Sequence, residues 1–374
     1  MADIRKRVGR KGTTYQVRYP SKATKSGYAF ASFDTRKEAL DFIHSGKARE
    51  AGSASRSDIR TVRQAADLWL KACEKEGLNG REQVTAYTYK NYEYRVGFIN
   101  RYGWTKSIQD LTPPDVVAFR SWLLAEGLSR DLAGKVLSTL HSILKEMTIR
   151  GVLLHNVATG ICIRSDARYQ EPVVIPSKRD VIELLAAADR LANSKNLKTA
   201  QTWTRYRPIL YLAADSGMRP QEYLALARSA IDAKGVHVTR AIDGSGHALT
   251  VTKTAAGRRF IELSPDTLDM VRHYSDPHAT LNDFDLVFPA SNGRWLCRKN
   301  WQRRGFNEAC LEAGLVETVE KDGERIEVPK YRPYDLRHFF ASMLIERNTN
   351  LKKLQKLMGN NNIETTLNVY GHLL

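Results

Sequence analysis

Four short segments in the C-terminal half of this 374-residue chain each carry one residue suited to phosphate chemistry. Three of these residues are cations, and the fourth is a tyrosine near the end of the sequence. A site built from all four requires a fold that brings distant parts of the chain together. The segments are GMRPQE with Arg219, TVTKTAAGRR with Lys253, YDLRHFFAS with Arg337, and LNVYGHLL with Tyr370.

This set of side chains has the chemistry to break a phosphodiester bond without a metal ion. The cations would neutralise charge on the non-bridging phosphate oxygens while the phenol attacks and holds the strand covalently. Two arginines offer a bidentate grip on phosphate from two sides, which a lysine could not reproduce. One segment alone is a weak signal, whereas all four in this order are a specific one.

Arg219 is predicted to lie at a break between two helices. Gly217 is typical of the C-cap of the first helix, and Pro220 of the first residue of the second. Glu222 follows within the first turn of the second helix, where its carboxylate can orient Arg219. For this segment taken alone, the alternative is a surface arginine in an ordinary turn.

Lys253 lies between two predicted strands, 248–251 and 259–263, with the sequence TAAG as the turn. We therefore expect Lys253 to project from a hairpin formed by these strands. Arg258 and Arg259 follow closely in the chain and are rival contacts to phosphate.

With these four segments the chain resembles the tyrosine recombinases, the phage-integrase family. The resemblance implies that Tyr370 is the nucleophile, that Arg219 and Arg337 hold the scissile phosphate, and that Lys253 is the general acid. A lysine suits that role because neighbouring cations lower its pKa. The resemblance also implies a 3′-phosphotyrosine intermediate with no metal and no nucleotide cofactor, in keeping with the absence of a GxxxxGK[ST] sequence.

Two positions depart from the family pattern, and we include both as site residues. Tyr334 stands where a histidine or another basic residue is usual, and Asn360 where histidine or tryptophan is usual. A phenol with a pKa near 10 is a poor general base, and an amide can donate a hydrogen bond but carries no charge. His338, one residue past Arg337, is predicted to face elsewhere on its helix and to be structural.

Tyr370 belongs to the last predicted helix, on one face with Ile363 and Leu367. The alternative to a nucleophile is a tyrosine that simply packs on this face. His372 is predicted to cap the helix or to face solvent.

The composition indicates a polyanionic partner, because the formal net charge is +17 and clustered Lys and Arg release counterions from phosphates. No apolar run approaches the ~18 residues of a membrane-spanning segment, and the basic N-terminus lacks the apolar stretch of a secretory signal. We therefore expect a cytoplasmic protein at the host nucleoid. The four cysteines form no CxxC pair, which predicts reduced thiols and no zinc site.

Residues 1–52 are predicted to form a basic unit of strands and a helix, which resembles the arm DNA-binding domain of many phage integrases. Alternating segments at 14–19 and 28–33 indicate strands. Thr35 and Glu38 then form a capping box that opens a helix. The alternative is a basic, partly disordered tail.

Residues 58–165 are predicted to form an all-helical domain, joined to the arm by the linker GSASRSD. A four-helix segment ahead of the catalytic part resembles the core-DNA-binding domain of the family. Aromatic and basic residues interleave along its second helix, where they could follow a DNA backbone or simply pack. The helices are expected at 62–76, 83–100, 113–126 and 130–149, and the interleaved residues are Tyr87, Tyr89, Lys90, Tyr92, Tyr94 and Arg95.

Residues 172–374 are predicted to form a mixed α+β catalytic domain, with the segment 163–177 as the hinge before it. Helices are expected from residue 178 and over 205–216, then strands around 236–263, then helices to the end. The fold class is therefore multidomain, mainly α with small β-sheets.

The sequence thus predicts a site-specific DNA recombinase or integrase of a phage or mobile element. The resemblance implies double-stranded attachment sites as partners, a homotetramer on two DNA sites, and accessory DNA-bending or directionality factors. One alternative is a topoisomerase that nicks and closes DNA by the same tyrosine chemistry, against which the arm domain argues. The other is a non-catalytic DNA-binding relic, which Tyr334 and Asn360 keep open.

Overall fold

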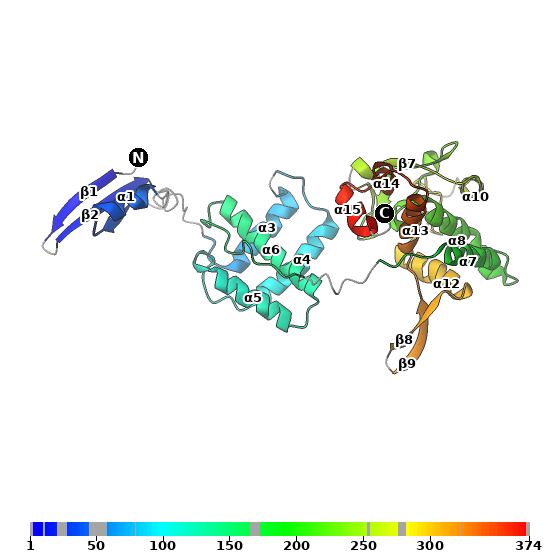
Figure 1. Cartoon of the computed structure of the whole chain (residues 1–374), viewed down its shortest axis with the longest axis horizontal. Coiled ribbons are helices and arrows are strands. Elements are labelled where there is room, and N and C mark those ends of the chain that lie inside the picture. Colours follow the sequence, from blue (N-terminus) through cyan, green and yellow to red (C-terminus); the bar gives the residue numbers. More distant parts are fainter. Residues whose placement is uncertain are drawn as a thin grey trace. The chain divides into compact units, whose positions relative to one another are not determined.

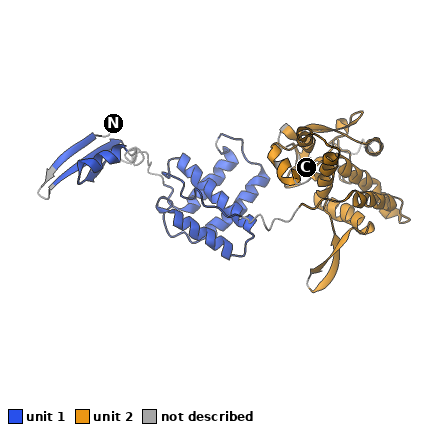
Figure 2. Cartoon of the chain, in the orientation of Figure 1, with its two compact units in different colours: residues 1–170 blue, residues 171–374 orange. Residues whose placement is uncertain are grey.

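The chain divides into two compact units, residues 1–170 and 171–374, in the computed structural model (Figures 1 and 2). The first unit holds both the predicted arm and the predicted helical domain, whose separation stays a prediction. No helix of the described part combines the length and apolar character needed to span a membrane. The structure describes residues 3–9, 12–20, 28–44, 58–78, 80–164, 173–252, 255–275, 282–321 and 323–371.

The N-terminal segment forms a three-stranded antiparallel sheet with one helix against it. The helix packs through Phe42, whose ring lies 5.6 Å from that of Tyr19 and 5.1 Å from that of Phe33. The Thr35 hydroxyl accepts from the backbone N–H of Glu38, as the capping box predicted. The first strand was not predicted, because its alternation is hidden in a basic run. The elements are β1 (Asp3–Gly9), β2 (Gly12–Pro20), β3 (Tyr28–Phe33) and α1 (Arg36–His44).

Four helices follow in the first unit, within a few residues of their predicted bounds, around a core that includes Trp69, Phe119 and Ile143. A capping box at Thr61 and another at Thr112 fix two of the helix starts. The predicted linker falls outside the described residues except for its last position. The helices are α3 (Val62–Lys75), α4 (Ala86–Arg101), α5 (Pro113–Ala125) and α6 (Arg130–Ile149).

The tyrosine-rich face of α4 splits into a packed part and an exposed part. Tyr92 packs against the core, with its ring 4.8 Å from that of Trp69, and Tyr89 is half-buried beside the same core. Tyr87 and Tyr94 are exposed, and so is Lys90 between them. Only the exposed part is available to contact another molecule.

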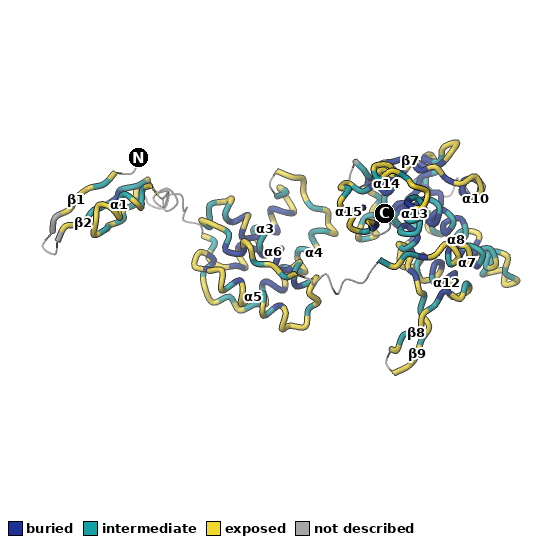
Figure 3. The backbone as a smooth tube through the Cα atoms, in the orientation of Figure 1, coloured by how far each residue is buried: buried dark blue, intermediate teal, exposed yellow. Residues whose placement is uncertain are grey.

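The second unit packs helices around a central helix, α8, which contacts α7, α10 and α13. Its core includes Trp203, Trp301 and Phe306. Figure 3 colours the buried residues of this unit dark blue. α8 begins eight residues before the predicted start because Asn196 caps it, accepting from the N–H groups of Lys198 and Thr199. The helices in this part are α7 (Lys178–Ala192), α8 (Leu197–Ser216), α9 (Pro220–Tyr223), α10 (Pro265–Ser275), α11 (Arg298–Trp301) and α12 (Asn307–Glu312), with a π-helical turn, η5 (Gln302–Phe306), between the last two.

The strands around 236–263 do not form the predicted hairpin about Lys253. The strand before Lys253 pairs backwards with β5, and the strand after it pairs with β4. The hairpin prediction was therefore wrong, because strand pairing is set by partners outside the local segment. The strands are β4 (Gly235–Val238), β5 (Arg240–Ile242), β6 (Leu249–Val251) and β7 (Arg259–Glu262), with a short turn of helix, η4 (Ala255–Gly257), between the last two.

A second departure is a hairpin of β8 (Val316–Lys321) and β9 (Glu324–Pro329), where only helices were predicted. It projects from the second unit (Figure 1). Its alternating sequence, VETVEK and ERIEVP about an Asp-Gly turn, is a strand signal that the sequence interpretation missed.

The chain ends in three helices that build a small core of their own, which includes Ala341, Leu354, Met358 and Tyr370. They follow the hairpin in the chain. Arg337 and Tyr370 lie within these helices, and Tyr334 and Asn360 lie next to them. The helices are α13 (Asp335–Glu346), α14 (Leu351–Met358) and α15 (Ile363–Tyr370).

Candidate active site

Arg219 stands at the helix break that the sequence predicted. Gly217 ends α8 in the left-handed conformation, with φ of 59°, where a Cβ would also meet the ring of Phe340 at 2.2 Å. Arg219 then caps α9, and Pro220 is the first residue of that helix. The Arg219 side chain remains 32% exposed, so part of its guanidinium can still reach a ligand.

Glu222 orients Arg219, as predicted. One carboxylate oxygen accepts from the Arg219 backbone N–H at 2.9 Å, and the other accepts from Nη1 at 2.9 Å. Burial alone would raise the pKa of Glu222, but hydrogen bonds and charge from Arg259, with the charge of Arg219, hold this pKa below its ordinary value. The carboxylate is therefore ionised and fixes the direction of the Arg219 side chain.

Arg259 is an internal partner of Glu222 and not a rival phosphate contact. Its Nη2 lies 2.8 Å from a Glu222 oxygen, and its side chain is 1% exposed. Nε donates to the carbonyl of Leu357 at 2.6 Å, which ties β7 to the end of α14. Arg258 is exposed, and its contact with phosphate stays a prediction.

Arg337 lies in the first turn of α13 and is 2% exposed. Nη1 donates to the carbonyl of Gly217 at 2.7 Å, and Nη2 donates to the carbonyl of Met358. Burial and the charge of Arg219 lower the pKa of Arg337 to about 10, so it stays charged at neutral pH. These contacts bring the predicted pair of arginines to the same place from α9 and α13.

Asn360 joins the two arginines through one oxygen. Its Oδ1 accepts from Nη2 of Arg219 at 3.3 Å and from Nη2 of Arg337 at 3.2 Å. Its amide nitrogen donates instead to the hydroxyl of Thr366, at 3.1 Å. Gly359, in the left-handed conformation with φ of 61°, ends α14 and turns Asn360 into this position.

Tyr370 ends α15 and is 2% exposed. Its hydroxyl lies 2.8 Å from Nδ1 of His338. Burial raises the pKa of Tyr370 above its ordinary value, although the charges of Arg337 and Arg219 act in the opposite direction. Leu367 is exposed, so the predicted helix face is wrong in part: the packed face runs through Thr366 and Tyr370 instead.

The prediction that His338 faces away from the site was wrong. Its ring is half-buried beside Tyr370, with centroids 5.6 Å apart, and the exposed ring of Tyr334 meets it edge-on at 5.3 Å. Successive residues on a helix point about 100° apart, so Arg337 can face Asn360 while His338 faces α15. The spacing of Tyr334 and His338 by four residues is the sequence signal that could have revealed this contact.

Two predicted positions lie outside the described residues: Lys253 and His372. The neighbouring Thr252 is buried. Among the residues that are described, no cluster of three or more His, Cys, Asp or Glu is placed to hold a metal ion.

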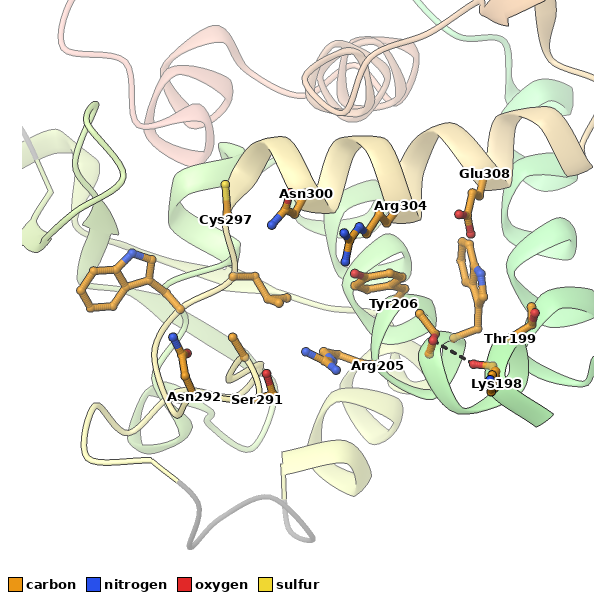
Figure 4. Close-up of a pocket in the computed structure, with 15 residues that line it drawn as sticks. Lys198, Thr199, Arg205, Tyr206, Ser291, Asn292, Cys297, Asn300, Arg304 and Glu308 are labelled. Atoms are coloured by element: carbon orange, nitrogen blue, oxygen red, sulfur yellow. Dashed lines mark hydrogen bonds between the residues drawn. The ribbon is translucent and has the colours of Figure 1, made fainter. Parts of the chain in front are cut away.

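A separate cavity of about 710 Å³ lies in the second unit, between α8 and the helical segment formed by α11, η5 and α12 (Figure 4). Cationic side chains, including Lys198, Arg205 and Arg304, line it together with Asn300 and Glu308. None of the predicted site residues that the structure describes lines this cavity.

Comparison with known proteins agrees with the geometry. A family model described as "Phage integrase family" matches residues 178–374. Tyrosine recombinase XerC of Brucella melitensis biotype 1 is 24% identical over 319 residues, covering 83% of this chain and 90% of that protein. Tyrosine recombinase XerD of Rhizobium meliloti is 23% identical over 303 residues, covering 80% of this chain and 89% of that protein.

Two groups of solved structures share the fold. The integrase of the Tn1549 transposon, in complex with a circular intermediate DNA, matches with a TM-score of 0.64 at 17% identity, over 83% of this chain and 95% of that one. A lambda integrase tetramer bound to a Holliday junction matches with a TM-score of 0.55 at 17% identity, over 96% of this chain and 95% of that one.

The matched family segment spans more than half of the chain and contains every predicted site residue. The chain therefore belongs to the phage integrase family and is a tyrosine recombinase. The predicted class of enzyme and the predicted fold class, helical with small sheets and a mixed α+β catalytic part, are confirmed.

Proposed function

We propose that this chain is the site-specific DNA recombinase, or integrase, of a phage or other mobile genetic element. The observation that carries the proposal is the shared acceptor at Asn360, on which the guanidinium groups of Arg219 and Arg337 converge. Two fixed guanidinium groups close to a buried tyrosine suit the transfer of a phosphoryl group to a phenol.

In the proposed cleavage step, the Tyr370 oxygen attacks the scissile phosphorus and forms a 3′-phosphotyrosine bond. The bond between phosphorus and the 5′ oxygen breaks, and Lys253 supplies the proton that makes this oxygen a hydroxyl. The phenolic proton of Tyr370 leaves to solvent. Arg219 and Arg337 would neutralise the charge on the non-bridging oxygens throughout, and the exposed Tyr334 would donate a hydrogen bond to one of them.

In the joining step, the 5′-hydroxyl of a partner duplex attacks the phosphotyrosine and releases the phenol. One phosphoester replaces another at each step, so the reaction needs no nucleotide cofactor and the proposed mechanism uses no metal. A 5′-hydroxyl from the same duplex would give a topoisomerase instead, which the basic sheet-and-helix segment at the N-terminus disfavours.

We extend the proposal to the parts of the chain. Residues 1–52 would bind separate arm sites, residues 58–165 would bind the core site, and residues 172–374 would cut it. The net charge of +17 supports contact with DNA phosphates, and the exposed Tyr87, Lys90 and Tyr94 on α4 are suited to such contacts. Four copies on two attachment sites would form the working assembly at the host nucleoid in the cytoplasm, with accessory bending or directionality factors.

A nicked suicide substrate tests the chemistry. The nick lets a short fragment diffuse away after cleavage, so a covalent protein–DNA adduct accumulates and appears on a denaturing gel. An adduct supports the enzyme, and its absence on the DNA that flanks the mobile element would favour the relic. Exchange between two labelled duplexes then separates a recombinase from a topoisomerase, which relaxes supercoils without exchange.

A further inference from the structure

The contact between His338 and Tyr370 joins two helices that are distant in the sequence. His338 is on α13 and Tyr370 ends α15, and the distance between Nδ1 and the phenolic oxygen is 2.8 Å. α14 packs against both helices, so the contact belongs to the small core of the C-terminal helices. A hydrogen bond at this distance fixes the direction of the hydroxyl as well as that of the ring.

The chemistry of the two groups decides which of them donates. Burial and the charge of Arg337 lower the pKa of His338 to about 4, so the imidazole is neutral at physiological pH. Burial keeps Tyr370 as a phenol. A phenol is the stronger acid of these two neutral groups, so its O–H donates and Nδ1 accepts, which leaves the imidazole proton on Nε2.

The same surroundings argue against proton transfer to His338. An imidazolium would lie half-buried beside the charged Arg337, which disfavours it. His338 is thus a hydrogen-bond acceptor and not a general base. Tyr334 also packs edge-on against the imidazole, at 5.3 Å between centroids, which limits rotation of the ring.

We propose that His338 is a positioning residue that accepts a hydrogen bond from Tyr370 and so holds the nucleophilic oxygen in one orientation for attack. The inference rests on the proposed function, in which Tyr370 is the nucleophile. A phenol without this partner would sample other rotamers and be aligned for a smaller share of the time.

The first experiment measures single-turnover cleavage of the nicked substrate by the full-length protein. His338→Leu, which keeps most of the volume but removes the acceptor, should slow cleavage about three- to tenfold, the effect of one ordinary hydrogen bond. His338→Asn should restore most of the rate, because Asn Oδ1 can take the position of Nδ1. DNA affinity and melting temperature should stay close to wild type in the rescued variant.

His237→Leu is the matched control, because His237 is a half-exposed histidine of the same unit that pairs with Asp232 at 3.1 Å. Its cleavage rate should be unchanged. Equal rates in His338→Leu and wild type, or a rate in His338→Asn as low as that in His338→Leu, would overturn the proposal. A pH profile would overturn it as well. If the wild-type cleavage rate falls as the pH is lowered from 8 to 6, and the rate of His338→Asn shows no such fall, His338 acts as a general base.

A second experiment does not depend on catalysis. In full-length protein labelled with ¹⁵N-histidine, the resonance of His338 Nδ1 should have the shift of an unprotonated nitrogen that accepts a hydrogen bond. Tyr370→Phe should move this resonance, whereas His237→Leu should not. A resonance that ignores Tyr370→Phe contradicts the contact itself. If Tyr370→Phe shifts the His338 resonance but the wild-type protein forms no covalent adduct, the contact exists and the proposed function is wrong.

Discussion

Arg337 donates a hydrogen bond from Nη2 to Oδ1 of Asn360 over 3.2 Å. Because Arg219 donates to the same oxygen, the amide holds two positive groups at one point against their mutual repulsion. The sequence analysis noted that the Asn360 amide can donate a hydrogen bond, and in the structure its nitrogen donates to Thr366. Asn360 is therefore better described as the acceptor that sets the spacing of the arginines.

Tyr370→Phe should abolish the covalent adduct while leaving affinity for site DNA nearly intact. The substitution removes only the attacking oxygen, and many other cations in this chain contact phosphate under the proposed function. The measurement is a denaturing gel with labelled DNA beside a binding titration. A covalent adduct that still forms in Tyr370→Phe would show that another tyrosine is the nucleophile.

Arg219→Ala should slow cleavage with a loss of ~2.7–4 kcal/mol of transition-state stabilisation, typical of removing one preorganised donor. Single-turnover rates on saturating substrate measure this loss. Arg190→Ala is the control, because Arg190 is a half-exposed arginine of the same unit that pairs with Glu312 at 3.0 Å and belongs to none of the predicted site positions. If both variants cleave within a few-fold of wild type, the assignment of Arg219 fails.

Glu222→Gln should destabilise the second unit by about 3–5 kcal/mol, because it leaves the buried Arg259 without its counter-charge. The pKa of Glu222 is held below its ordinary value of 4.5 in the folded protein. Its stabilising effect is therefore complete above pH 4.5 and is lost as the pH falls through the folded-state pKa. Thermal unfolding measured across pH should show that the difference in melting temperature between wild type and variant becomes smaller as the pH is lowered. A difference in melting temperature that does not change with pH would contradict the ion pair between Glu222 and Arg259.

The break at Arg219 could be predicted because its cause is local. A glycine C-cap, a proline at the first helical position and a glutamate three residues on all lie within six residues, and they specify the turn without help from the rest of the fold. The four helices of residues 58–165 also begin on local signals, since the structure shows capping boxes at Thr61 and Thr112 that mark two of their starts.

The contacts that the sequence did not reveal are made across long separations. The backward pairing of β6 with β5 depends on which strand is free to pair, and the local turn signal at TAAG pointed to the wrong partner. Arg259 looked like a second surface cation, yet a buried carboxylate from α9 draws it inward. His338 was set aside because it neighbours Arg337, although adjacent positions on a helix contact different partners.

Deleting residues 1–52 should leave cleavage of a core site intact and remove binding to distal arm sites. The deleted part carries the three-stranded sheet and α1, together with a dense set of Lys and Arg. Footprinting on DNA with both kinds of site measures the effect. An unchanged distal footprint would reduce the segment to a generic basic extension.

Asn360→Asp tests whether the shared acceptor works by geometry or also by its neutrality. The carboxylate keeps an oxygen for Arg219 and Arg337, so the folded protein should be at least as stable as wild type. The added negative charge should nevertheless slow cleavage, because it neutralises the arginines and repels the scissile phosphate.

Asn360→Ala should slow cleavage and also lower the melting temperature, since the buried Arg337 loses an acceptor. Measuring rate and melting temperature for both variants separates the two contributions. If Asn360→Asp cleaves as fast as wild type, neutrality at this position has no catalytic value and the amide serves only to space the arginines.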